Sequence, residues 1–192
     1  MTKEEIRELL VETDVIQEGH FVLSSGRHAD IYMQCAKVLQ YPKHAATLAA
    51  EIAAKWEDEE IDVVIGPALG GVVLSYAVAE ELGVRSIFSE RKNGEMKIRR
   101  GFELEPGEKV LVVEDVVTTG GSVKEVLAVL EGLDVEIVGL SSIVDRSNGQ
   151  VKFNYDFKAL LPVDIKSYKA GHCKLCEEGI AITRPGSKEN KS

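Results

Sequence analysis

The segment from Val110 to Ser122 constrains the fold of this chain more than any other. Its first four residues are all valine or leucine, and an unbroken apolar run predicts a strand that is buried on both faces of a sheet. Glu114 and Asp115 follow, and a turn of threonine, glycine and serine residues (118–122) then leads into a helical pattern. The segment therefore predicts one strand–loop–helix unit of an α/β fold.

The rest of the chain repeats this alternation of apolar strands and helices. Thr2 and Glu5 form a capping-box pattern, which predicts a helix over residues 3–13, and residues 19–42 are expected to form one or two short strands with a loop. Further strands are expected at 61–65, 85–89, 109–113, 135–144 and 157–161, and further helices at 44–57, 71–82 and 122–132. We therefore expect a central, mostly parallel sheet flanked by helices, in a single domain of 192 residues.

Composition excludes several classes of function. The net charge of -9 and the pI near 5.1 argue against a partner that is a nucleic acid or an anionic membrane. Three cysteines in 192 residues do not suggest a disulfide scaffold. The first ten residues resemble a charged helix rather than a signal peptide, and no apolar stretch is long enough to span a membrane. A cytoplasmic location is expected.

The turn over residues 118–122 has the composition of a phosphate-binding loop. Glycines let backbone N–H groups approach an anion, and the hydroxyls and the following helix N-terminus add to the attraction. The turn lacks the Gly-Lys-Ser/Thr of a Walker A loop and the Gly-x-Gly-x-x-Gly of a dinucleotide site. Because Glu114 and Asp115 would repel a phosphate, we expect them to face ribose hydroxyls or a hydrated Mg²⁺. The alternative is an ordinary glycine-rich turn with two solvated acids.

Two further segments suit a polyanionic leaving group. Residues 66–71 also follow an apolar strand and precede a helix; they form either an ordinary turn or a second phosphate site. Half of the residues in 91–100 are basic, which is either a solvated face or a binding loop. Asn93-Gly94 predicts a tight turn, so this stretch is expected to be a mobile hairpin or loop that closes over pyrophosphate.

The stretch from Val112 to Ser122 resembles the signature of the type I phosphoribosyltransferases, in which an apolar strand, two acids and a Thr/Gly/Ser turn follow one another. The resemblance implies a core of about 43–158 and a small hood of about 1–40 and 160–188. It also implies Mg²⁺, held mainly through the substrate with Asp115 as one candidate ligand. Phosphoribosyl pyrophosphate would be bound by Glu114, Asp115, Val116, Val117, Thr118, Thr119, Gly120, Gly121, Ser122, Ala68, Leu69, Gly70, Arg91 and Lys92.

Within that family, three segments resemble the orotate phosphoribosyltransferases. They are the Phe-x-Leu-x-Ser-Gly-Arg stretch at 21–27, Asp145-Arg146, and the tail at 176–188. The resemblance implies that orotate and phosphoribosyl pyrophosphate give orotidine 5'-monophosphate and pyrophosphate, in de novo pyrimidine (UMP) biosynthesis. Orotate would contact Ser25, Gly26, Tyr32, Thr118 and Arg146, although Arg146 could instead be a surface residue paired with Asp145.

In this family the basic loop serves the neighbouring subunit of a homodimer. Arg91 and Lys92 are similar to its opening pair, and Lys97 is the candidate catalytic lysine, alongside Asp115. Two features depart from the family pattern: Ser24 and Gly70 stand where many members carry lysine. These departures leave open a purine as the base. A regulator that senses phosphoribosyl pyrophosphate and binds nucleic acid is a third, more distant alternative.

Cysteines and histidines give a weaker signal. Cys173 and Cys176 form one Cys-x-x-Cys pair beside His172, whereas a structural zinc site normally has a second pair of ligands. We expect a simple turn there, with a metal or redox role as the lesser alternative. His20, His28 and His44 show no metal-binding spacing, although His28 is expected near the base, and Cys35 is expected to be buried.

Overall fold

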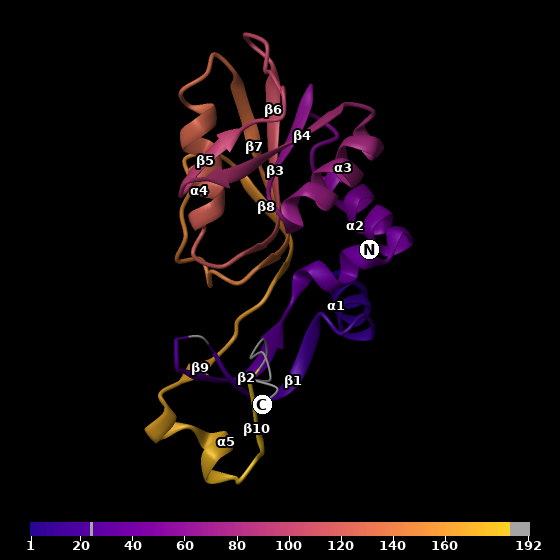
Figure 1. Ribbon diagram of the computed structural model, residues 1–192. Coiled ribbons are helices and arrows are strands. Elements are labelled where there is room, and N and C mark those ends of the chain that lie inside the picture. The colour runs from indigo at the N-terminus through magenta and orange to yellow at the C-terminus, as the bar shows by residue number, and fades with distance from the viewer. Residues whose placement is uncertain (24, 185–192) are drawn as a thin grey trace, which may run out of the picture.

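The computed structural model describes residues 1–23 and 25–184 and contains two β-sheets. Figure 1 shows the larger sheet and its helices as the upper body, with the smaller sheet below it. The larger sheet has the strand order β5-β4-β3-β6-β7-β8, and the smaller sheet has the order β10-β1-β2-β9.

Five of the six strands in the larger sheet are parallel, and β5 is antiparallel at the edge. The strands are β3 (Val63–Pro67), β4 (Arg85–Lys92), β5 (Glu95–Ile98), β6 (Lys109–Val117), β7 (Glu136–Asp145) and β8 (Phe157–Pro162). This architecture confirms the expected mostly parallel sheet.

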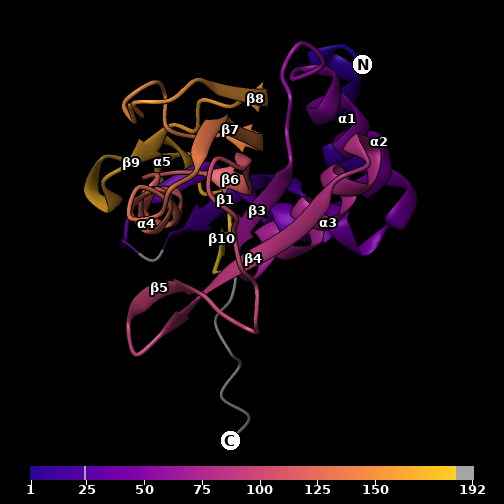
Figure 2. The same cartoon turned by 90° about the horizontal axis from the view of Figure 1, so that it is seen from above.

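Both faces of this sheet are covered, which explains the unbroken apolar run of β6. Leu111 and Val113 face the cluster formed with α1 (Lys3–Glu12), α2 (Pro42–Ala54) and α3 (Gly70–Leu82). Val110 and Val112 face the opposite cluster with α4 (Gly121–Leu130). Figure 2 shows α4 on one side of the sheet and the other three helices on the opposite side.

The smaller sheet joins the two ends of the chain and forms a hood. Its strands are β1 (Ile16–Val22), β2 (His28–Met33), β9 (Ser167–Tyr168) and β10 (Ile182–Thr183). The 3-10 helix η1 (Cys35–Gln40) leads from β2 to α2, and η2 (Ala170–His172) and α5 (Lys174–Glu177) lie between β9 and β10. The bounds expected for the hood and the core, 1–40 with 160–188 and 43–158, stay predictions.

The helix and strand predictions agree with the structure in type and approximate position. Thr2 and Glu5 form the capping box at the start of α1. The basic stretch is a regular hairpin of β4 and β5, with both Asn93 and Gly94 at positive φ in the turn. None of the helices in 1–23 and 25–184 is long and apolar enough to cross a bilayer.

Candidate active site

The predicted phosphate loop lies between the carboxyl end of β6 and the first turn of α4. Gly120 precedes α4 with a φ of 72°, and no side chain caps the helix. The N–H groups in the first turn of a helix lack intrahelical partners, so they are free to meet an anion. Residues 116–123 and Glu114 line a hollow of about 80 Å³ at this point. A water molecule in the liquid takes up about 30 Å³, so the hollow suits a group of a few heavy atoms.

Gly120 cannot be replaced by a larger residue without displacing its neighbours. A Cβ at this position would lie 2.8 Å from Val151 Cγ1 and 3.1 Å from Phe153 Cζ. The positive φ is also costly for any residue with a side chain. The turn therefore requires glycine for its conformation and for its packing.

Glu114 and Asp115 lie at the end of β6 as expected, but they are not solvated. Glu114 is only 8% exposed and Asp115 is half-buried. Burial, followed by the negative charge of Asp115, raises the pKa of Glu114 to about 8. Burial also raises the pKa of Asp115. The hydrogen bonds that its carboxylate accepts lower the pKa, but burial outweighs them. The alternative of two solvated acids beside an ordinary turn is therefore wrong.

The second loop, which follows β3, lies directly against this acid pair. A Cβ built on Gly70 would lie 2.4 Å from Asp115 Oδ2, and the peptide bond between Ala68 and Leu69 is cis. Because β3 and β6 are parallel neighbours, their carboxyl ends meet at one edge of the sheet. The fold thus brings both predicted anion-binding loops to one place.

Arg91 connects the basic hairpin to the same edge. Its guanidinium donates two hydrogen bonds to Glu125 in α4, at 2.8 and 3.0 Å. The pKa of Arg91 is raised, first by this partner and also by the charge of Glu114. Arg91 is therefore positioned at the helix that follows the phosphate loop.

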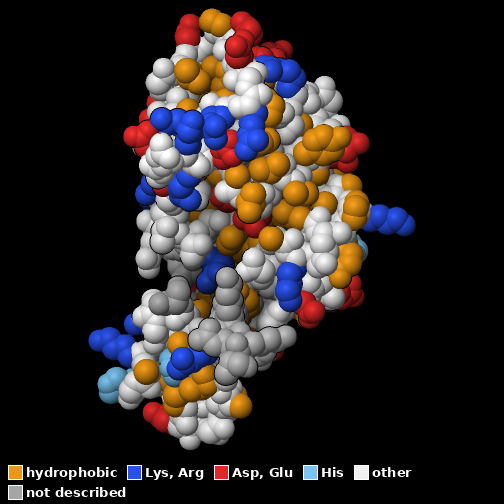
Figure 3. All heavy atoms as spheres, in the orientation of Figure 1, with side chains coloured by type: hydrophobic (Ala, Val, Ile, Leu, Met, Phe, Trp, Pro, Cys, Tyr) orange, Lys and Arg blue, Asp and Glu red, His pale blue; other side chains and the backbone are white. Residues whose placement is uncertain are grey.

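Three other cations of the hairpin are held in ion pairs with its glutamates. Lys97 forms an ion pair with Glu95 at 2.8 Å, while Arg99 and Arg100 both pair with Glu90. Lys97 also lines a surface hollow with residues from the last turn of α4, at the end of that helix opposite the phosphate loop. Figure 3 shows the basic side chains gathered over this part of the core. The structure does not bring Lys97 together with the acid pair of its own chain.

Arg146 lies at the other side of the acid pair, just after β7. Its Nε is buried and has no hydrogen-bond partner among the described residues. Burial lowers the pKa of Arg146, and the electrostatic influences that oppose this shift come from Cys35 and Tyr32. Asp145 does not pair with this guanidinium; its carboxylate accepts a hydrogen bond from the N–H of Ser147. The alternative of a surface Arg–Asp pair is therefore wrong.

Cys35 lies within electrostatic range of the acid pair and of Arg146, which was not predicted from the sequence. Burial raises the pKa of its thiol, and the charges of Asp115, Arg146 and Glu114 also act on it. The start of η1 therefore lies near enough to both the acid pair and Arg146 for their charges to act on it. No motif around Cys35 could have indicated this position, because it depends on how η1 packs against α3 and β6.

The loop between β1 and β2 carries the remaining residues predicted to contact the base. Gly26 has a φ of 74° and donates a backbone hydrogen bond to Leu23. Arg27 donates from Nε to Ser167 Oγ at 2.8 Å, which ties this loop to β9. Tyr32 packs against Phe21, with ring centroids 5.7 Å apart. Ser24, one of the two departures from the family pattern, lies outside the described residues, as does the tail beyond 184.

His20 and His28, which show no metal-binding spacing in the sequence, lie beside Cys173 and Cys176 in the fold. Their ring nitrogens lie within 4.8 Å of the thiol sulfurs of Cys173 and Cys176, and of each other. Strand pairing between β1 and β2 brings the two histidines together, and the fold of the chain end adds the cysteines. The Cys-x-x-Cys spacing was the available signal. His172, which precedes Cys173 in the sequence, is exposed and is not a member of this cluster.

Comparison with known proteins gives the family. Residues 36–172 match the phosphoribosyl transferase domain model. A relative from Caldicellulosiruptor saccharolyticus, named orotate phosphoribosyltransferase, is 53% identical over 191 residues and covers 100% of both chains. One of the same name from Thermoanaerobacter sp. (strain X514) is 51% identical over 98% of this chain and 100% of its own.

A solved structure agrees with these matches. The Mycobacterium tuberculosis orotate phosphoribosyltransferase, in complex with inorganic phosphate, superposes with a TM-score of 0.67 at 25% identity. The match covers 83% of this chain and 95% of that one. This chain therefore belongs to the phosphoribosyltransferase family, in its orotate phosphoribosyltransferase branch.

Proposed function

We propose that this chain transfers the 5-phosphoribosyl group of phosphoribosyl pyrophosphate to orotate, giving orotidine 5'-monophosphate and pyrophosphate. One observation carries the proposal: an open phosphate loop, an acid pair with Glu114 buried, and an arginine whose buried Nε has no partner among the described residues meet at one sheet edge. The relatives with about half of their residues identical support orotate as the base. The reaction belongs to de novo pyrimidine synthesis, and we place it in the cytoplasm.

The phosphoribosyl group takes the centre of the site. We assign its 5-phosphate to the turn 118–122, where the first N–H groups of α4 and the hydroxyls of Thr118, Thr119 and Ser122 can donate hydrogen bonds. Val116 and Val117 complete that side of the hollow. Glu114 and Asp115 accept hydrogen bonds from the ribose hydroxyls, because a carboxylate is a strong acceptor. This division keeps the acids away from the phosphate that they would repel.

Pyrophosphate leaves toward the loop after β3. We assign its contacts to Ala68, Leu69 and Gly70, with Arg91 and Lys92 as cations. In the reaction a ring nitrogen of orotate gives up its proton to solvent and forms the bond to ribose C1, while the bond from C1 to the pyrophosphate oxygen breaks. The electron pair of that bond leaves with pyrophosphate, so charge grows on the leaving group. Fixed cations lower the energy of this transition state.

Mg²⁺ fits the donor set at this edge. Carboxylate oxygens and substrate phosphates are the ligands that Mg²⁺ takes in such sites. The half-buried carboxylate of Asp115 lies beside the loop that we assign to pyrophosphate. We infer that the ion binds mainly through the phosphates and that Asp115 offers it an oxygen. When bound, Mg²⁺ neutralises charge on the leaving group.

Orotate lies between the acid pair and the hood. The unpartnered Nε–H of Arg146 matches the carboxylate of orotate, and such charge-assisted hydrogen bonds are the strong ones. Tyr32 acts electrostatically on Arg146 and so lies close to it. We assign the remaining contacts to Ser25, Gly26 and Thr118. A base without a negatively charged group would leave the buried Nε–H of Arg146 without a charged partner.

A homodimer is part of the proposal. Leu69, Val73 and Tyr76 are 87%, 46% and 67% exposed. Their spacing of four and three residues puts them on one face at the start of α3, and grouped apolar side chains of this kind are typical of an interface. In the dimer, the hairpin 91–100 would bring Lys97 to the neighbouring site, where we assign it the catalytic role.

The deciding experiment follows the absorbance of orotate. With phosphoribosyl pyrophosphate and Mg²⁺, the purified protein should consume orotate and release pyrophosphate in equal amounts. Adenine and xanthine, tested separately under the same conditions, should not be consumed. Consumption of a purine with orotate inert would overturn the base assignment and leave the phosphoribosyl site standing.

A further inference from the structure

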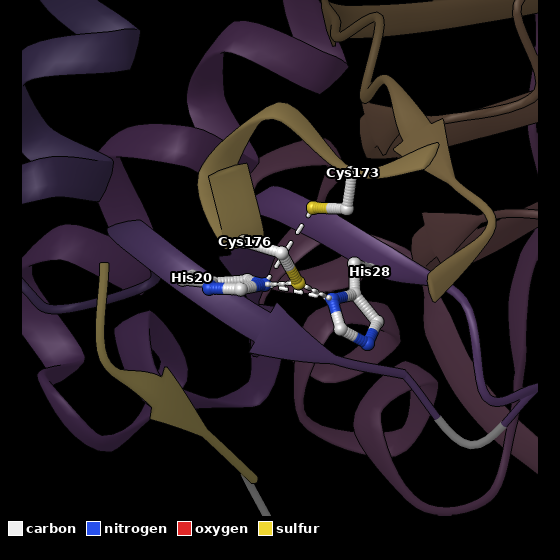
Figure 4. Close-up of side chains that lie close together, drawn as sticks. All are labelled: His20, His28, Cys173 and Cys176. Atoms are coloured by element: carbon white, nitrogen blue, oxygen red, sulfur yellow. Dashed lines mark hydrogen bonds between the residues drawn. The ribbon is translucent and has the colours of Figure 1, made fainter. Parts of the chain in front are cut away.

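Four side chains that play no part in the proposed reaction converge in the hood. His20 lies on β1, His28 lies on β2, and Cys173 and Cys176 lie on either side of the start of α5 (Figure 4). His20 and Cys173 are each 1% exposed, His28 is 6% exposed, and Cys176 is at the surface. Segments about 150 residues apart in the sequence thus bring two imidazoles and two thiols together.

The distances between these atoms suit a tetrahedral metal ion. Zinc lies about 2.3 Å from sulfur and about 2.0–2.1 Å from nitrogen, so its sulfur and nitrogen ligands are about 3.6 Å apart in a tetrahedron. The sulfurs of Cys173 and Cys176 lie 3.6 and 3.7 Å from His20 Nε2, and the Cys176 sulfur lies 3.4 Å from His28 Nδ1. The two ring nitrogens are 2.7 Å apart, so binding would separate them slightly.

The backbone fixes His20 in the form that a metal needs. His20 Nδ1 lies 2.8 Å from the carbonyl oxygen of Ile180, which can only accept a hydrogen bond. Nδ1 therefore carries the proton, and the lone pair of the neutral ring lies on Nε2, which faces the cluster. Zinc-binding histidines usually donate their other N–H to a carbonyl or carboxylate in this way.

From this arrangement we infer that the hood binds one structural zinc ion through His20, His28, Cys173 and Cys176. Four protein ligands close the coordination shell, which is typical of a structural site rather than a catalytic one. Soft thiolates with imidazoles favour zinc over Mg²⁺. The site is separate from the Mg²⁺ that we assign to the reaction.

The chain end needs such a cross-link because it buries few apolar side chains. Among residues 163–184, only Cys173 is buried; α5 has four residues, and β9 and β10 have two each. A segment with so little apolar burial gains little from packing, and metal binding supplies the missing free energy. Zinc would hold this segment to both β1 and β2.

The same ion would hold in place the loop that we assign to the base, an inference that rests on the proposed function. His28 begins β2 directly after the loop that carries Ser25 and Gly26, and Arg27 ties that loop to Ser167. Loss of zinc should therefore raise KM for orotate several-fold and leave KM for phosphoribosyl pyrophosphate nearly unchanged. The phosphate loop is built on β6 and α4, away from the hood.

Metal content tests the site without any assay of activity. The full chain, expressed with added zinc and purified under reducing conditions without chelator, should contain about one zinc per chain by mass spectrometry of the elements. Cys176→Ser removes one ligand at an exposed position, so the fold should survive, and zinc content should fall to about a tenth or less. His172→Ala is the matched control, because His172 is exposed in the same segment; it should keep the metal.

Cobalt gives a second, geometric readout. Chain stripped of metal and loaded with Co²⁺ should show the intense visible absorption of tetrahedral thiolate coordination, and Cys176→Ser should lose it. The proposal is overturned if the wild-type chain neither contains zinc nor takes it up from an equimolar solution, or if Cys176→Ser binds as much zinc as wild type. A zinc-containing chain that is inert toward orotate would instead refute only the proposed function.

Discussion

At the scale of single residues, the burial of Glu114 makes substrate binding dependent on pH. Its carboxyl has a pKa raised to about 8, so the free protein holds a proton there at neutral pH. Ribose hydroxyls donate hydrogen bonds and favour the ionised carboxylate, so binding should release this proton. The affinity for phosphoribosyl pyrophosphate should therefore increase as pH rises toward the raised pKa, and then level off.

Calorimetry between about pH 6 and pH 9 measures this effect, with buffers of different ionisation enthalpy to count the released proton. Glu114→Gln cannot ionise, so its affinity should be lower above the raised pKa and should change less with pH. An equal pH dependence in wild type and Glu114→Gln would rule out Glu114 as the group that titrates.

The buried, unpartnered Nε of Arg146 gives a prediction specific to the base. Arg146→Gln removes the charge that we pair with the orotate carboxylate. A hydrogen bond to a charged group contributes about 1.5–3 kcal/mol, so KM for orotate should rise about ten- to hundredfold. KM for phosphoribosyl pyrophosphate should change little in the same steady-state assay. Arg7→Gln, which removes an exposed arginine paired with Glu18, is the control. An unchanged KM for orotate in Arg146→Gln would refute this contact.

At the scale of elements, the close approach of two loops limits what can replace Gly70. A Cβ there would lie 2.6 Å from Asp115 Cγ, so Gly70→Ala must turn the carboxylate of Asp115 away. Since we assign that carboxylate to ribose and Mg²⁺, kcat/KM for phosphoribosyl pyrophosphate should fall at least about tenfold. Gly132→Ala, whose Cβ would lie 3.4 Å from the nearest atom, should keep wild-type kinetics. A fully active Gly70→Ala chain would show that the position of Asp115 is not critical.

The elements also show what the sequence could and could not predict. Strand β6 was predictable because both of its faces are buried, so its apolar run is unbroken, and the acids and the glycine-rich turn follow it directly. The hood was harder to predict, because β9 and β10 have two residues each and form only by pairing with β2 and β1. Such short strands carry no periodicity of their own.

Dependence on long-range contacts also explains which parts of the sites were not predicted. The phosphate loop is local in sequence, so its residues could be recognised together. The position of Cys35 beside the acid pair depends on tertiary packing, as does the meeting of His20 and His28 with Cys173 and Cys176. Apart from the Cys-x-x-Cys pair, residue spacing along the chain carries no information about such contacts.

At the scale of the whole molecule, the position of Lys97 distinguishes a complete site from a shared one. Within one chain, Lys97 pairs with Glu95 and lines a hollow at the far end of α4 from the phosphate loop. A catalytic role for Lys97 therefore requires a second chain that places its own acid pair near this hairpin. The basic hairpin and the exposed residues Leu69, Val73 and Tyr76 would then both belong to the dimer contacts.

Hybrid dimers test this sharing directly. Two variants, Lys97→Ala and Asp115→Asn, are expected to be nearly inactive alone. They are co-expressed with two different tags, and dimers that carry both tags are isolated. A shared site gives the hybrid one pocket with both defects and one with neither, so its activity should be about half that of wild type. In the control hybrid of Glu114→Gln with Asp115→Asn, every pocket keeps one defect, so activity should stay low. If the Lys97 hybrid is as inactive as its parents, or if no hybrid can be isolated, Lys97 does not serve a neighbouring chain.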